Sequence, residues 1–200
     1  MINVYYDAET TGINPYHSEI IEAFFYISKD NFFHLKCRPD IWSYEAEKVH
    51  NIPEYVAMTY PKKKDAFREL LKWLPNNFRF ITYANKNTEL GFLNFDVAIL
   101  VNELNLLGYK NYYLENVYNM KPNLSVHTMA REAASRRLFL PIRKKSKTGK
   151  MIQSLSQENV YMALFGANYD GAHDAKKDVM ALIEIYNKLT MLISSENMLI

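Results

Sequence analysis

Three β-rich segments fill the first 37 residues of the chain, and this is the feature that most limits its fold. Segments 2–7, 19–28 and 32–37 are rich in aromatic and β-branched residues, several of them in alternation with polar ones, as is typical of strands. Short stretches that favour turns separate them, at 12–15 and 29–31. Because consecutive strands joined by short turns pair in antiparallel fashion, we expect a three-stranded meander.

The pattern changes beyond this region, where helical segments alternate with short β-rich ones. Segment 66–74 has a helical period and ends at Pro75, and the apolar segment 92–107 is followed by Gly108, both common ends of helices. Strands that alternate with helices favour parallel pairing. We therefore expect an α/β domain that spans 1–200, with a mixed five-stranded sheet (three antiparallel strands plus two parallel) flanked by helices. The elements expected after the meander are helix 66–74, strand 78–83, helix 92–107, strand 125–128, and helices 129–137, 157–164 and 175–192.

Composition sets the class of protein. Hydrophobic residues make up 48% and charged residues 23% of the chain, which is a globular composition with enough apolar side chains for a core. Cys37 is the one cysteine, so no internal disulfide forms and a reducing compartment is expected. No apolar run approaches the length of a membrane span. We expect an intracellular, cytoplasmic protein, and the abundance of Asn, Lys, Tyr and Ile favours a viral or phage source.

Basic residues gather in one part of the chain. Residues 133–157 contain no Asp or Glu but seven Lys or Arg residues. We expect a flexible basic loop over 141–153. Two interpretations stay open: a solvated loop, or a flank that binds the phosphates of nucleic acid. The candidates for such a flank are Arg143, Lys144, Lys145 and Lys147.

Two carboxylates end the first expected strand. Asp7 and Glu9 are two positions apart, so in a strand both side chains lie on the same face. Two negative charges in one place repel unless a cation neutralises them, and carboxylate oxygens suit Mg²⁺ or Mn²⁺. A bare pair of this kind is equally compatible with a polar strand end that caps a turn.

Two further places carry acids in unusual contexts. Asp96 lies in the apolar helical segment 92–107, where burial would be costly without a partner, although it could also occupy the polar face of an amphipathic helix. His173 precedes Asp178 by five residues at the start of the last expected helix, with Asp174 as a candidate N-cap. Taken singly, such a His and Asp are more often solvated than catalytic.

Together these residues match the pattern of a known family. The segment 7–12 reads Asp-Ala-Glu-Thr-Thr-Gly, Phe95-Asp96 precedes an apolar helix, and His173 stands five residues before Asp178. This set resembles the DEDDh family of 3′→5′ exonucleases, which includes the proofreading subunit of bacterial replicative DNA polymerase and ribonuclease T. A secondary match lies at 46–52, similar to an Ala-x-x-Val-His-Gly-Ile stretch of the proofreading branch. The resemblance implies an RNase H-like fold.

It also implies a mechanism. Two divalent cations, Mg²⁺ or Mn²⁺, are expected on Asp7, Glu9, Asp96 and Asp178, where they would stabilise the attacking and leaving oxygens. His173 is expected to be the general base that takes a proton from the attacking water. The products implied are nucleoside 5′-monophosphates.

The resemblance implies substrate contacts near the same place. Thr10, Thr11 and Gly12 are expected to contact the terminal nucleotide, Ile13 to pack against its base, and His50 to line the pocket. The two threonine hydroxyls could equally serve only to stabilise the turn.

Three positions differ from the family pattern. The usual His-Asn pair is absent, and 84–87 are separated from Asp96 by several additional residues. His127 stands where many relatives have Asp, and Asn51 replaces a common glycine.

The hypothesis is thus a metal-dependent 3′→5′ exonuclease on single-stranded or frayed nucleic acid ends, with DNA favoured over RNA. One alternative is a hydrolase of very short oligonucleotides or another small phosphodiester. The other is a catalytically silent nucleic-acid-binding module. The partners expected are nucleic acid 3′ ends, with no membrane, and a homodimer or a polymerase or replication partner stays open.

Overall fold

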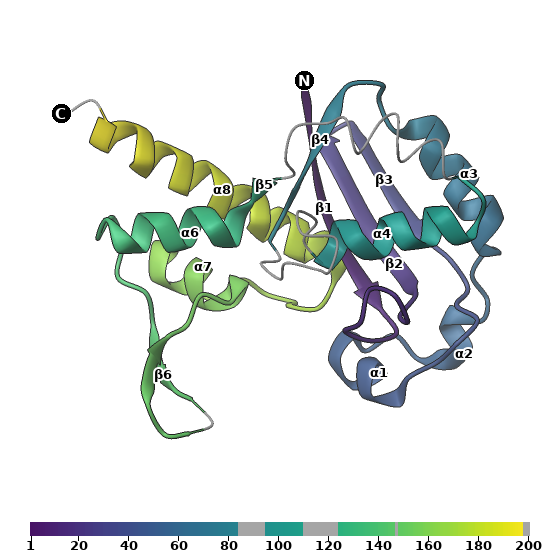
Figure 1. The fold of residues 1–200 in the computed structure, drawn as a ribbon, viewed down its shortest axis with the longest axis horizontal. Coiled ribbons are helices and arrows are strands. Elements are labelled where there is room, and N and C mark those ends of the chain that lie inside the picture. The colour runs from purple at the N-terminus through teal and green to yellow at the C-terminus, as the bar shows by residue number, and fades with distance from the viewer. Residues whose placement is uncertain (84–94, 110–123, 147, 198–200) are drawn as a thin grey trace.

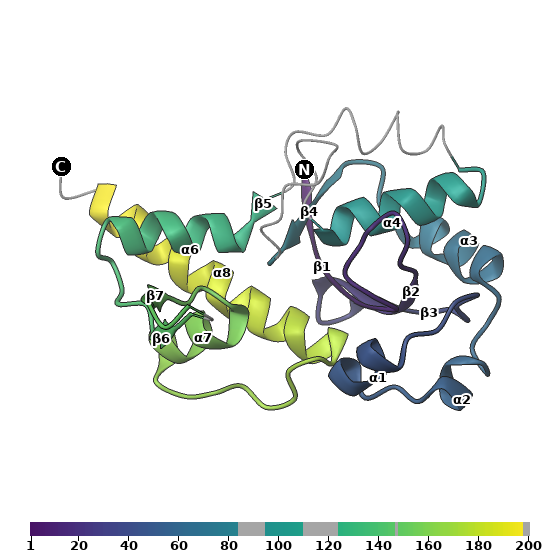
Figure 2. The ribbon, with the colours of Figure 1, turned by 60° about the horizontal axis from the view of Figure 1, so that its bottom comes forward.

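A computed structural model describes residues 1–83, 95–109, 124–146 and 148–197 of the chain. Five strands form one mixed sheet, helices cover both of its faces, and a separate two-stranded hairpin projects beside α7 (Figures 1 and 2). The elements are β1 (Ile2–Thr10), β2 (Ile20–Ser28), β3 (Asn31–Lys36), α1 (Tyr44–His50), α2 (Glu54–Ala57), α3 (Lys63–Trp73), β4 (Phe78–Thr82), α4 (Phe95–Leu106), β5 (Leu124–Ser125), α6 (Val126–Ser135), β6 (Arg143–Lys145), β7 (Met151–Gln153), α7 (Gln157–Phe165) and α8 (Ala175–Asn197).

The order of strands in the sheet is β3-β2-β1-β4-β5. β1 pairs antiparallel with β2, and β2 antiparallel with β3. On its other side β1 pairs parallel with β4, which pairs parallel with β5. The expected mixed sheet of three antiparallel and two parallel strands, flanked by helices in an RNase H-like arrangement, is confirmed.

The central strand β1 separates two apolar cores. Tyr6 points into the core formed with α3 and α4, where its ring stacks on Phe25 at 4.5 Å between centroids. Tyr5 points into the other core, formed with α6, α7 and α8, where its ring meets Tyr186 edge-on at 5.7 Å. Because side chains alternate along a strand, Asp7 follows Tyr5 to the α8 face of the sheet.

The segment around Ser125 differs from the sequence-based expectation. A strand over 125–128 and a helix over 129–137 were expected, whereas β5 ends at Ser125 and α6 begins at Val126. The cause is a side-chain cap, because Ser125 Oγ accepts a hydrogen bond from the main-chain N–H of Thr128. His127 consequently lies in the first turn of a helix rather than in a strand.

The sequence did not predict the short helices α1 and α2. Ser43 caps α1, its Oγ accepting from the N–H of Ala46 at 3.2 Å. Asn51 ends that helix in the left-handed conformation, with φ of 56°. Asparagine is among the few residues besides glycine that adopt this conformation readily. Asn51 thus adopts a conformation that glycine also favours.

The basic segment 141–153, for which we expect a flexible loop, contains two short paired strands. β6 and β7 pair antiparallel, with Lys144 opposite Ile152 and Lys145 opposite Met151. In Figure 1 this hairpin extends away from the sheet and its helices. Lys147 lies outside the described residues, as do the segment 84–87 and the first residues of the helix expected over 92–107. Among the described helices none is long and apolar enough to cross a membrane.

Candidate active site

Three carboxylates meet at one end of the sheet. Asp7 and Glu9 come from β1, and Asp178 comes from the first turn of α8, which packs on the same face of the sheet. Each contributes an oxygen to a group in which these atoms all lie within 4.8 Å of one another. The expectation that Asp7 and Glu9 share a face, and that Asp178 turns inward toward them, agrees with this geometry.

Burial and mutual repulsion make this cluster unfavourable when all its members are charged. Burial raises the pKa of Asp7 well above its usual range, and the negative charges of Asp96, Asp178 and Glu9 raise it further. Burial, followed by the charge of Asp178, raises the pKa of Glu9 to about 8. A bound cation would remove this repulsion.

Asp96 lies beside the group of three rather than within it. It opens α4 and is only 6% exposed, so it does not occupy a solvated helix face. Its charge is the first coulombic contribution to the raised pKa of Asp7. The structure therefore brings Asp96 into the electrostatic environment of Asp7, while the oxygens that lie within 4.8 Å of one another belong to Asp7, Glu9 and Asp178.

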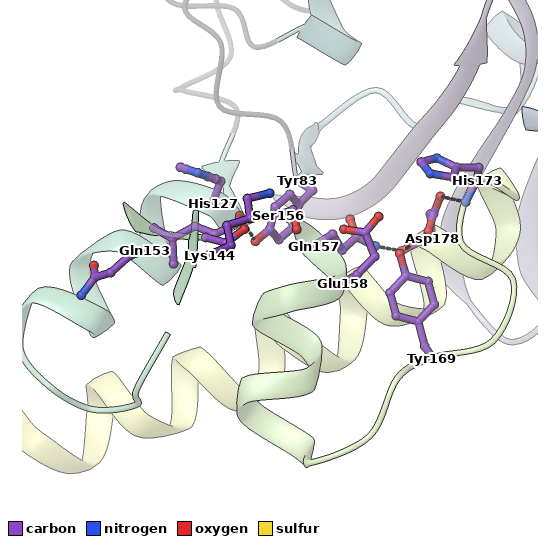
Figure 3. Close-up of a pocket in the computed structure, with 12 residues that line it drawn as sticks. Tyr83, His127, Lys144, Gln153, Ser156, Gln157, Glu158, Tyr169, His173 and Asp178 are labelled. Carbon is purple, nitrogen blue, oxygen red and sulfur yellow. Dashed lines mark hydrogen bonds between the residues drawn. The ribbon is translucent and has the colours of Figure 1, made fainter. Parts of the chain in front are cut away.

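His173 lies on the loop between α7 and α8. Its main-chain N–H donates a hydrogen bond to Oδ2 of Asp178 at 3.0 Å, and its backbone is left-handed, with φ of 67°. The helix that follows is capped by Asp174, whose Oδ1 accepts from the N–H groups of Lys176 and Lys177, as expected for an N-cap. In Figure 3 the imidazole of His173 lies beside the Asp178 carboxylate.

The turn after β1 is stabilised by its own hydroxyls. Thr10 Oγ1 donates to the carbonyl of Gly12 at 2.7 Å, and Thr11 Oγ1 accepts from the N–H of Glu19 at 2.9 Å. A Cβ atom on Gly12 would lie 2.8 Å from Ser18 Oγ, so a larger residue there would displace the Ser18 side chain. Ile13 is 81% exposed at the tip. Both threonines thus have a structural role, and Ile13 is free to contact another molecule.

His50 is more enclosed than a pocket-lining role requires. It is 6% exposed, and its Nδ1 accepts from the N–H of Ile52 at 3.0 Å. Burial lowers the pKa of His50, and interaction with His173 lowers it further. His50 therefore lies within electrostatic range of His173, although it does not line the pocket described next.

A pocket of about 430 Å³ opens beside the carboxylates. Figure 3 shows it extending from His173 and Asp178 toward the hairpin, where Lys144 of β6 contributes to its wall. The sequence did not single out most of the lining residues. Those are Tyr83, Gln153, Ser154, Leu155, Ser156, Gln157, Glu158 and Tyr169. Tyr169 has no distinguishing signal in the sequence, because it is one of 15 tyrosines.

The donor set fits a divalent cation. It consists of carboxylate oxygens from three residues, two of them buried, on a rigid strand and the first turn of a helix. Mg²⁺ and Mn²⁺ prefer such ligands. Asp7, Glu9 and Asp178 could hold one ion. Asp96, at the start of α4, lies near enough for its charge to act on Asp7.

Comparison with known proteins supports the fold. No protein-family model matches the sequence, and no curated protein matches it. Solved structures of exonuclease I match over nearly the whole chain. One is a zinc-bound complex of the E. coli enzyme with single-stranded DNA (TM-score 0.73, 16% identity, 96% of this chain and 42% of that one). Another is a product-bound exonuclease I (TM-score 0.71, 17% identity, 94% and 43%).

The chain thus spans about two fifths of the length of these enzymes. At such low identity, the likeness establishes a shared fold between this chain and the matched part of those enzymes, and in this chain that fold is the five-stranded mixed sheet with its flanking helices.

Proposed function

We propose that the chain is a metal-dependent 3′→5′ exonuclease of the DEDDh type that acts on single-stranded nucleic acid. The observation that carries this proposal is the group of Asp7, Glu9 and Asp178, the last two of them buried, with His173 hydrogen-bonded to Asp178 through its main chain. The similarity in fold to exonuclease I, which has been solved with single-stranded DNA, supports the same function.

Two divalent cations, Mg²⁺ or Mn²⁺, would supply charge stabilisation for the attacking and leaving oxygens of the displacement. Asp7, Glu9, Asp96 and Asp178 are the residues of this chain that would hold them. His173 takes a proton from the attacking water as that water's oxygen bonds to phosphorus. The bond from phosphorus to the 3′ oxygen of the preceding nucleotide then breaks. A nucleoside 5′-monophosphate leaves, and the released 3′ oxygen takes a proton from solvent, so the shortened strand ends in a 3′ hydroxyl.

The turn after β1 would receive the terminal nucleotide. The main chain of Thr10, Thr11 and Gly12 lies next to the carboxylates of β1, and exposed Ile13 would pack against the terminal base. His50 would shape this region from behind, since its ring is buried and in electrostatic range of His173. We propose that DNA is the favoured substrate and that the protein acts inside the cell. The candidate partners are a replication protein and a second copy of this chain.

The hairpin would hold the strand upstream of its 3′ end, as the candidate flank Arg143, Lys144, Lys145 and Lys147. Lys144 lines the pocket that adjoins the carboxylates, whereas exposed Lys145 does not. We propose that a strand longer than a dinucleotide extends from the carboxylates to Lys144, because both lie along the same pocket. The positive charge of Lys144 would then attract a phosphate of the strand.

We expect Lys144→Ala to raise KM for a long single strand roughly tenfold, since loss of one charged contact costs about 1.5 kcal/mol. The slope of log KM against log salt should fall by about 0.7, the value for one phosphate contact on a single strand. Lys29→Ala, the same change in the exposed turn between β2 and β3, is the matched control and should leave KM unchanged. Equal changes of KM in the two variants would favour a solvated hairpin. So would an equal change of KM for dinucleotides and long strands in Lys144→Ala.

The proposed function is tested with the purified chain, Mg²⁺ or Mn²⁺, and matched single-stranded DNA, RNA, duplex and dinucleotide substrates. Progressive shortening of single strands supports the exonuclease. Cleavage confined to dinucleotides or cyclic nucleotides would favour the small-phosphodiester alternative. Binding of single strands without any cleavage would favour the silent binding module.

A further inference from the structure

Asp178 accepts two hydrogen bonds from the loop that precedes its helix. The hydroxyl of Tyr169 donates to Oδ1 at 2.5 Å, and the main-chain N–H of His173 donates to Oδ2 at 3.0 Å. Each carboxylate oxygen thus has one donor within hydrogen-bond distance, and both donors come from the segment between α7 and α8. Figure 3 shows the two bonds on opposite sides of the same carboxylate.

Tyr169 is itself held in place by neighbours outside the carboxylate group. Its ring packs edge-on against Tyr161 of α7, at 5.2 Å between centroids. Tyr161 is fixed in turn by a hydrogen bond from its hydroxyl to Glu184 of α8 at 2.5 Å. The Tyr169 hydroxyl is therefore directed at Asp178 by packing that does not depend on a cation. Gln157 strengthens the same junction, since its Nε2 donates to the main-chain oxygen of Asp178 at 2.7 Å.

The hydrogen bond leaves Asp178 able to bind a cation. A carboxylate oxygen has two lone pairs, and Tyr169 occupies one of those on Oδ1. A phenol remains protonated near neutral pH, so it acts as a donor and does not compete for the cation as an anionic ligand. Hydrogen bonds of this kind orient ligating carboxylates, and their loss typically lowers metal affinity by 10- to 100-fold.

We propose that Tyr169 is a positioning residue: its hydroxyl orients Asp178 for metal binding and ties the loop that carries His173 to the same carboxylate. This inference rests on the proposed function, because it takes Asp178 as a metal ligand. Tyr169 lies outside all of the sequence motifs. Its side chain links Asp178, a metal ligand in the proposed function, to the loop that carries His173.

The test is the affinity of Tyr169→Phe for Mn²⁺ alone, measured by titration without substrate. We expect binding about 10- to 100-fold weaker than in the unaltered chain. Tyr44→Phe is the matched control, because it also removes a hydroxyl that donates to a carboxylate, but that carboxylate is Glu54 of α2, outside the site and without contact to Tyr169. Mn²⁺ affinity of the control should be unchanged.

A second readout separates positioning from a general loss of structure. The rise in melting temperature that Mn²⁺ causes should shrink in Tyr169→Phe, and this difference is independent of the variant's stability without metal. High Mn²⁺ should restore the turnover of Tyr169→Phe but not that of Asp178→Asn.

Mn²⁺ affinity within twofold of the unaltered chain in Tyr169→Phe would overturn the inference while leaving the proposed function intact. Absence of Mn²⁺ binding in the unaltered chain would overturn both.

Discussion

Replacement of Asp7 by asparagine should abolish cleavage. The change keeps the size of the side chain but removes a negative charge from the group formed with Glu9 and Asp178. A metal ion supplies several kcal/mol of charge stabilisation in such displacements. Because about 1.4 kcal/mol corresponds to a factor of ten in rate, we expect turnover to fall at least about a thousandfold. Mn²⁺ binding should be lost in parallel.

The same variant should not be less stable than the unaltered chain when no metal is present. Burial and the charges of Asp96, Asp178 and Glu9 raise the pKa of Asp7. Removing one of these charges relieves repulsion in the cluster. Thermal unfolding without metal therefore shows whether lost activity reflects lost structure. Asp30→Asn, the same change in an exposed turn, is the control and should keep full turnover. Full activity in Asp7→Asn would contradict the proposed metal centre.

Replacement of His173 should reduce turnover while leaving metal and substrate binding intact. The main-chain N–H of His173, not its ring, bonds Asp178, so a change of side chain retains that bond. His173 has a left-handed backbone with φ of 67°. Asparagine tolerates this conformation better than alanine. His173→Asn is therefore the cleaner variant, and we expect turnover to fall about 10²- to 10⁴-fold, the usual contribution of a general base.

The measurement is single-turnover cleavage with separate determination of Mn²⁺ affinity and KM, which should both stay near their original values. Asp178→Asn is the informative comparison, since it should lose metal binding as well as turnover. Turnover of His173→Asn within a few-fold of the unaltered chain would show that the ring does not take the proton, and loss of Mn²⁺ binding would show that it acts through the metal ligands instead.

The sequence predicted the features that depend on strand periodicity and on charge. The two-residue spacing of Asp7 and Glu9 places both on one face of an extended strand. The structure, in which β1 continues past the expected 2–7 to Thr10, has them together with Asp178. The mixed sheet was predicted from the three β-rich segments at the start of the chain and from the strands that alternate with helices after them. The apolar context of Asp96 is compatible with burial and also with the polar face of a helix, and its burial at the start of α4 is a tertiary property that no local pattern reveals.

The sequence did not predict features that depend on one cap, on the pairing of very short strands or on a single contact between distant residues. The early start of α6 depends on the Ser125 cap, and the hairpin depends on pairing between two short segments without alternation. Tyr169 contacts Asp178 only because the loop between α7 and α8 folds back over the carboxylate. The side chains of Thr10 and Thr11 both form hydrogen bonds that stabilise the turn, as the structural interpretation of these residues predicts, and their contact with a nucleotide stays a prediction.

The most direct test of the central claim compares one single-stranded DNA labelled at its 5′ end with the same strand labelled at its 3′ end, both with Mn²⁺. If the chain is a 3′→5′ exonuclease, the 5′-labelled strand should shorten stepwise into a ladder. The 3′ label should appear at the earliest times as a nucleoside 5′-monophosphate, and chelation of Mn²⁺ should stop both. Immediate release of the 5′ label, internal cuts without a ladder, or no cleavage at all would contradict it.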